Sequence, residues 1–153
     1  MLLDNSMYRL TVEKDIVKAK DSTERFDGVS GSEWDFSTVD EGGVSLKSLA
    51  PAYGASAVDP NTTKLKAVFD DDISAVSGKD LLDAVRVYNS DRKIYEDIDE
   101  VEIKGDTLII TLEDNLGSGD TFEVTIKSGY LEDDNSGVNY GGLNGGDWQF
   151  TTD

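Results

Sequence analysis

The residues with the clearest chemical potential in this chain are carboxylates and side-chain amides that gather in two stretches. Within residues 129–153, we single out four candidate metal ligands: Asp133, Asp134, Asn135 and Asp147. A shorter candidate is the acidic run 70–72, where Asp70 and Asp72 lie two residues apart. Carboxylate and carbonyl oxygens are the ligands that calcium prefers. The first expectation is a chain without a cofactor, and calcium is the one cofactor for which these residues make a candidate site.

The same carboxylates have a simpler interpretation as solvated surface. The chain holds 32 acidic and 14 basic residues, with a formal net charge of −18, so that acidic side chains are common throughout. The sequence contains no 12-residue loop with the ligand spacing of an EF-hand. Both interpretations, a calcium loop and a solvated acidic surface, stay open on the sequence alone.

The composition excludes several function classes. Cysteine and histidine are absent, which excludes disulfides, Cys/His zinc sites, cysteine nucleophiles and the Ser-His-Asp triad. The negative charge disfavours nucleic acids and anionic membranes as partners. No run of about 20 apolar residues predicts insertion into a membrane. A pair of carboxylates is the remaining route to catalysis, and because no cleft motif accompanies one, we predict that the chain is not an enzyme.

An internal repeat organises the chain. At an offset of 114 residues (122 minus 8), residues 8–38 align with residues 122–152 without a gap, and apolar residues alternate in both copies. The identical pairs include Gly28 and Gly142, Gly31 and Gly145, Trp34 and Trp148, Phe36 and Phe150, and Thr38 and Thr152. Matched glycines and a matched Trp-x-Phe-x-Thr ending indicate a tandem repeat of about this length.

The repeat predicts three parts. Residues 1–39 correspond to the C-terminal hairpin of a preceding, truncated repeat, residues 40–47 are a polar linker containing glycine, and residues 48–153 form a complete domain. In the partial copy, Asp133 and Asp134 are replaced by Ala19 and Lys20. A calcium site at this position is therefore not a fixed property of the repeat.

Short alternating segments bounded by turn residues predict strands along the complete unit. We expect a split first strand over 48–51 and 55–58, and a short helical turn over 78–83. Further strands are expected over 64–69, 84–88, 92–95, 101–103, 107–112, 121–126 and 147–152. About seven strands without a sustained helical period predict an all-β, immunoglobulin-like antiparallel β-sandwich.

The order of these motifs resembles the bacterial Ig-like domains of S-layer and other surface proteins. Residues 50–58 and 64–70 resemble the opening of that family, and residues 116–126 resemble its penultimate strand. Its turn and terminus are matched by residues 129–134 and 148–152, although the loop between them carries additional Gly-Gly pairs. The resemblance implies a modular spacer or lattice domain outside the cell, in some members associated with calcium, without catalysis of its own.

We therefore expect a structural or spacer module of a bacterial cell-surface or S-layer-associated protein, with neighbouring Ig-like repeats as partners. The location would be extracellular, at the cell surface or cell wall. Because residues 1–5 lack a basic region and a long apolar stretch, we expect any export signal to lie outside this sequence.

The alternative function is a carbohydrate- or ligand-binding, adhesin-like module. It requires Trp148 to be exposed beside Tyr130 or Tyr140 as a stacking platform. The simpler interpretation of Trp34 and Trp148 is core packing, because each lies two residues before a phenylalanine on the same face of a closing strand.

The N-terminal hairpin poses a physical problem, because a lone two-stranded hairpin is marginally stable in water. We expect residues 1–39 either to pack on the sandwich of the same chain or to pair with a second chain in a homodimer, since the hairpin leaves edges unpaired.

Overall fold

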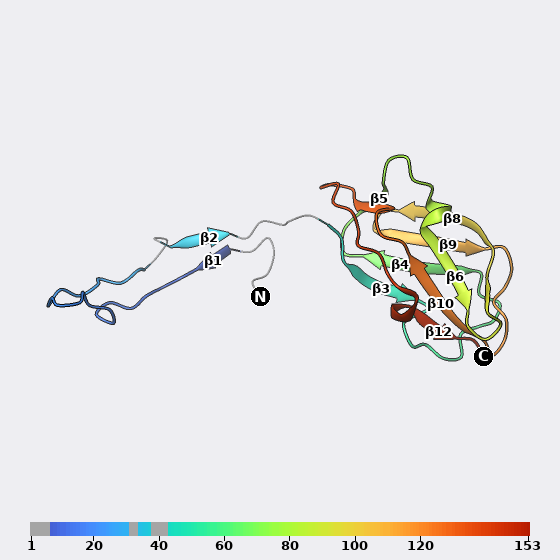
Figure 1. Cartoon of the computed structure of the whole chain (residues 1–153), viewed down its shortest axis with the longest axis horizontal. Helices are drawn as coiled ribbons and strands as arrows, with labels where there is room; N and C mark the ends of the chain where they lie inside the picture. The colour runs from blue at the N-terminus through green and yellow to red at the C-terminus, as the bar shows by residue number, and fades with distance from the viewer. Residues whose placement is uncertain (1–6, 31–33, 38–42) are drawn as a thin grey trace. The chain divides into compact units, whose positions relative to one another are not determined.

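Residues 7–30, 34–37 and 43–153 are described by the computed structural model, and they fall into two units. The first unit lies within Met1–Glu41 and the second within Gly42–Asp153. Both consist of β-strands, with two short 3-10 helices in the second unit (Figure 1). Neither helix has the length and apolar character needed to cross a bilayer, and the described ranges contain no other helix.

The second unit contains two four-stranded antiparallel sheets, and β6 and β10 lie in front of β4 and β9 in Figure 1. In spatial order, the first sheet is β3 (Leu46–Ala50), β4 (Lys64–Phe69), β9 (Thr107–Leu112) and β8 (Ile98–Lys104). The second sheet is β12 (Gln149–Thr151), β10 (Thr121–Ile126), β6 (Val85–Asn89) and β7 (Ile94–Tyr95). This is the strand order of an immunoglobulin sandwich, A-B-E-D against G-F-C-C′. The predicted fold class is confirmed.

Period-two alternation places one face of each central strand in the core between the sheets. In β4, Leu65, Ala67 and Phe69 are buried, whereas Lys64 and Lys66 are exposed. Every second residue of β10 and Phe150 of β12 belong to the same apolar cluster. Burial of these side chains is the main stabilising contribution, because successive strand residues point to opposite faces.

Two short elements of the fold are strands that sequence periodicity did not predict. β5 (Ile73–Ala75) and β11 (Leu131–Asp133) pair antiparallel and form a small separate sheet. Three residues are too few to show an alternation. The pairing joins the loop after β4 to the loop after β10, which lie far apart in sequence.

The two helices differ in how well the sequence indicated them. The turn expected over 78–83 is the 3-10 helix η1 (Leu81–Ala84), whose cap Asp80 accepts a hydrogen bond from the amide of Leu82. The helix η2 (Gly145–Asp147) occupies the start of the segment expected as the closing strand, so that β12 begins only at Gln149.

The start of the second unit differs from the expected linker and split first strand. Val44 is buried in the core and β3 begins at Leu46, so apolar residues of the expected linker 40–47 belong to the domain. Beyond β3, the chain crosses to the other sheet, where Val58 forms a parallel bridge with Thr152. The physical reason for the earlier start is the burial of the Val44 side chain.

The chain enters and leaves the sandwich at opposite ends. At the entry, Leu46 pairs with Phe69, the last residue of β4. At the exit, the amide of Asp153 donates to the carbonyl of Val58, which lies shortly before β4 begins. Entry and exit are therefore separated by the length of β4.

The first unit is a hairpin with the same geometry as the end of the second. β1 (Met7–Arg9) pairs with β2 (Asp35–Ser37), and the pair Tyr8–Phe36 repeats the pair Phe122–Phe150 at the offset of 114 residues (122 minus 8). The bridges beyond the strands repeat as well: Val12–Val29 matches Ile126–Leu143, and Lys18–Arg25 matches Glu132–Asn139.

Candidate functional site

The end of the sandwich where the chain enters brings three loops together. Pairing of β5 with β11 places the acidic run 70–72 beside residues 133–138, and the amide of Asp134 donates to the carbonyl of Asp72 at 3.0 Å. The hairpin between β8 and β9 joins them, because the amide of Ile73 donates to the carbonyl of Gly105 at 3.0 Å. This entry end is the candidate site that the structure assembles from the predicted residues.

Asp133 is the most enclosed carboxylate of the entry end, with 4% of the residue exposed. Its Oδ1 accepts hydrogen bonds from the amides of Asn135 and Ser136, both at 2.8 Å. Its Oδ2 accepts the amide of Gly43 at 3.2 Å. These donors, Ser136 above all, hold the pKa of the Asp133 carboxyl below its usual value, because they stabilise the charged form. Asp133 therefore ties the loop to the entering chain.

A second aspartate holds the same entering segment. Oδ1 of Asp70 accepts a hydrogen bond from the amide of Ser45 at 2.7 Å, and the amide of Asp70 donates to the carbonyl of Ser45 at 3.0 Å. The amide of Gly43 also donates a hydrogen bond to the hydroxyl oxygen of Ser136 at 3.2 Å. Two acidic side chains thus serve as acceptors for backbone amides where the chain enters the domain.

The predicted calcium ligands are only partly brought together. Asp133, Asp134 and Asn135 share one loop beside Asp72, whereas Asp147 lies on η2. Across the ranges that the structure describes, no group of three or more acidic side chains is arranged to hold a metal ion. Because the oxygens of Asp133 are engaged by amides, calcium would have to compete with these hydrogen bonds. A calcium site and an acidic surface without a bound ion are therefore separated by a thermal melt with calcium and with a chelator.

The prediction of an aromatic platform around Trp148, which the ligand-binding alternative required, is wrong, because Trp148 has no exposed surface. Its indole Nε1 donates to the carbonyl of Pro51 at 2.8 Å, so its polar group is satisfied inside the fold. Tyr140 packs edge-on against Phe69, with ring centroids 5.0 Å apart. The core-packing interpretation of Trp148 is correct, and the equivalent Trp34 in the hairpin is instead exposed.

Sequence reasoning missed a row of side chains on the outer face of the second sheet. Register places Gln149, Glu123, Tyr88 and Tyr95 opposite one another across β12, β10, β6 and β7. The two tyrosine rings are tilted with centroids 5.0 Å apart, and Tyr95 is 59% exposed. Gln149 Nε2 donates to Glu123 Oε1 at 3.2 Å. The available signal was the alternation in β6, because its residues that do not face the core, Tyr88 among them, point outward.

The exit end of the sandwich contains a buried polar network. Nδ2 of Asn89, which is fully buried, donates to Oδ2 of Asp120 at 3.0 Å, and Arg92 forms an ion pair with the same oxygen at 2.7 Å. The carbonyl of Asp120 accepts the amide of Thr152 at 3.0 Å. Through Thr152, which directly follows β12, this network holds the end of the last strand in place, and we interpret its role as structural.

The fold and the loops at its ends define an Ig-like β-sandwich module. A profile of the family described as bacterial Ig-like domain matches residues 40–152, and the chain belongs to that family. No curated protein matches the sequence.

Solved structures of the bacterial S-layer protein SbsC are similar in fold. The N-terminal part of SbsC has a TM-score of 0.52 and 20% identity, over 72% of this chain and 23% of that one. Two longer SbsC structures, rSbsC(31-844) and domains 1-6, both have a TM-score of 0.50, with 21% and 23% identity. Each similarity covers 71% of this chain and 13% of the SbsC chain. The chain thus spans less than a quarter of the structures it resembles.

Proposed function

We propose that the chain is a non-catalytic structural module of a bacterial cell-surface protein, located outside the cell, where it acts as a spacer between neighbouring Ig-like repeats. Membership of the bacterial Ig-like family supports this role. The observation that carries it is the placement of entry and exit at opposite ends of the sandwich, beside Phe69 and Val58 respectively. Modules connected in this way extend a protein with each repeat added.

The contacts at the two ends suit a spacer. At the entry, Asp133 and Asp70 hold the backbone of Gly43 and Ser45. At the exit, the network around Asp120 holds Thr152. Because these backbone amides donate to acceptors of the domain, each junction is part of the folded domain, and consecutive repeats would be connected by a short segment.

The location is tested with antibodies raised against this chain and applied to intact cells of the bacterium that encodes it. We expect labelling of intact cells, and loss of that labelling after brief treatment with an external protease. Antibody binding that requires lysis of the cells would contradict the proposed location.

The outer row of Tyr88, Tyr95, Glu123 and Gln149 favours glycan binding as a second candidate function. The exposed ring of Tyr95 and the half-buried ring of Tyr88, beside a carboxylate and an amide, offer both stacking and hydrogen bonding to a sugar. The test is retention of the protein on purified cell-wall polysaccharide. Tyr95→Ala should abolish retention, whereas the control Tyr53→Ala removes an equally exposed tyrosine from outside the row. Equal retention of both variants would eliminate this candidate.

A further inference from the structure

The hairpin of the first unit exposes apolar side chains whose repeat equivalents form the core of the second. Trp34 is 51% exposed, whereas Trp148 at the equivalent position is fully buried. Leu10 and Phe36 are also exposed, and their equivalents Val124 and Phe150 are buried. The apolar surface of the hairpin is therefore one half of a sandwich core, presented to solvent.

The backbone geometry of the two hairpins agrees in detail. The amide of Leu10 donates to the carbonyl of Trp34 at 3.0 Å, as that of Val124 does to Trp148 at 2.9 Å. Gly28 and Gly142 both have φ +88°, and at each a Cβ would meet backbone atoms at less than 3.0 Å. The hairpin therefore presents its side chains in the arrangement that fits the other half of an Ig-like sandwich.

The second unit shows what lies against such a hairpin. There, β10 pairs with β12 along one edge and with β6 along the opposite edge. In the pairing with β6, Glu123 is opposite Tyr88 and Thr125 is opposite Arg86. Within the described ranges, β1 belongs to a two-stranded sheet with β2 alone, so the edge carrying Arg9 and Thr11 has no such neighbour.

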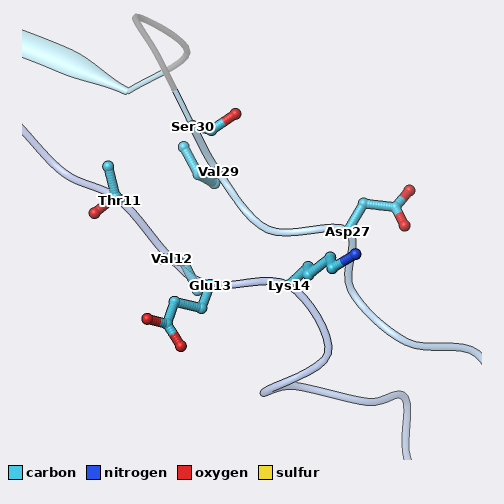
Figure 2. A pocket seen from close by; sticks show the side chains of 7 residues that line it. All are labelled: Thr11, Val12, Glu13, Lys14, Asp27, Val29 and Ser30. Carbon is cyan, nitrogen blue, oxygen red and sulfur yellow. The ribbon is translucent and has the colours of Figure 1, made fainter.

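A surface hollow lies between the two arms of the hairpin. Figure 2 shows it between segments 11–14 and 27–30, with Val12 and Val29 among the residues that line it. In the second unit, the position equivalent to Val12 is Ile126, which is buried and paired with Val85 at the start of β6. The hollow is thus lined in part by a side chain whose equivalent is buried in the core of the second unit.

We propose that the β1–β2 hairpin is an interaction surface whose partner is an Ig-like sandwich lacking its own last two strands. The partner supplies one strand beside β1, as β6 lies beside β10, and a sheet like β3-β4-β9-β8 over the apolar face. The second unit of the same chain is not this partner, because β10 and β12 already occupy that place. The inference goes beyond the spacer role and rests on hairpin geometry, not on cellular location.

The test supplies such a partner at the N-terminus. The full chain is extended by a second copy of residues 42–114 placed before Met1, which stands at repeat position 115 (1 plus 114). Quenching of tryptophan fluorescence by acrylamide measures how accessible each indole is, and the contribution of Trp34 is the difference between the extended chain and its Trp34→Phe variant. We expect the accessibility of Trp34 to fall to that of Trp148. The calorimetric enthalpy of unfolding should about double, because it scales with the number of folded residues.

A matched pair of variants tests the interface itself. Leu10→Asp places a charge on the apolar face of the hairpin, and Thr23→Asp places the same charge at the exposed end where its two arms meet. In the extended chain, Leu10→Asp should restore the full exposure of Trp34, whereas Thr23→Asp should leave it shielded. If Trp34 is as accessible in the extended chain as in the original, or if both variants behave alike, the proposal is overturned.

Light scattering of the unextended chain tests a competing occupant. We expect a monomer in which Trp34 is accessible. A dimer in which Trp34 is shielded would overturn the assignment and identify a second copy of this chain as the partner.

Discussion

Asp133 accepts a hydrogen bond from the backbone amide of Gly43 at 3.2 Å, although 90 residues separate the two in sequence. The contact connects the last residue of β11 to the segment by which the chain enters the domain. A carboxylate that the sequence singled out as a metal ligand therefore has a defined partner in the backbone of its own chain.

Replacing Asp133 should destabilise the second unit. Asp133→Asn turns one acceptor oxygen into an amino group facing backbone amides, so at least one of three hydrogen bonds is lost. We expect a lower urea midpoint in circular dichroism. Asp134→Asn is the matched control, because Asp134 is exposed and contributes its backbone amide to the contact with Asp72. Equal midpoints for the two variants would show that the Asp133 bonds contribute nothing to stability.

The same carboxylate should make stability depend on pH in acid. The pKa of Asp133 is lower in the folded protein than in the unfolded chain, so the unfolded chain binds more protons between the two values and stability rises with pH there. This contribution is complete above the unfolded value of about 4 and is lost as the pH falls through the folded value. The difference in urea midpoint between wild type and Asp133→Asn should therefore shrink below about pH 4. A difference that stays constant from neutral to acid pH would contradict the assignment.

Equivalent phenylalanines in the two units should contribute differently to stability. Phe150 is buried and stacks on Phe122 with centroids 5.6 Å apart, so Phe150→Ala should cost about 3–5 kcal/mol in the unfolding of the second unit. Phe36 is exposed and stacks on Tyr8, so Phe36→Ala should change the same free energy by less than about 1 kcal/mol. Urea unfolding of both variants checks this. Equal losses would mean that the hairpin shares the core of the second unit.

Calcium is expected to leave the melting temperature unchanged relative to a chelator. Both oxygens of Asp133 accept backbone amides, and Oδ1 of Asp70 accepts that of Ser45, so calcium would displace existing hydrogen bonds. A ligand that binds the native state raises the melting temperature by mass action. A rise with calcium that Asp134→Asn removes would instead establish an ion site in this loop.

Much of the fold was predictable because sheet periodicity is a local property. Alternation over 64–69 and 121–126 identified β4 and β10 within their observed bounds. The outer aromatic row was not predictable, because register across four strands decides that Tyr88 and Tyr95 meet. The small sheet of β5 and β11 was missed for the same reason, since three-residue strands are defined only by their partners.

The linear order of residues determined the repeat, the positions of most strands and the family, because all three are patterns along one chain. Tertiary structure decided which distant residues meet. Asp72 and Asp134 are joined by the pairing of β5 with β11, while Asp147, closer to Asp134 in sequence, lies on η2. The same Trp-x-Phe motif is buried at Trp148 and exposed at Trp34. Burial is a property of the strands that lie opposite a side chain, and a local motif does not contain them.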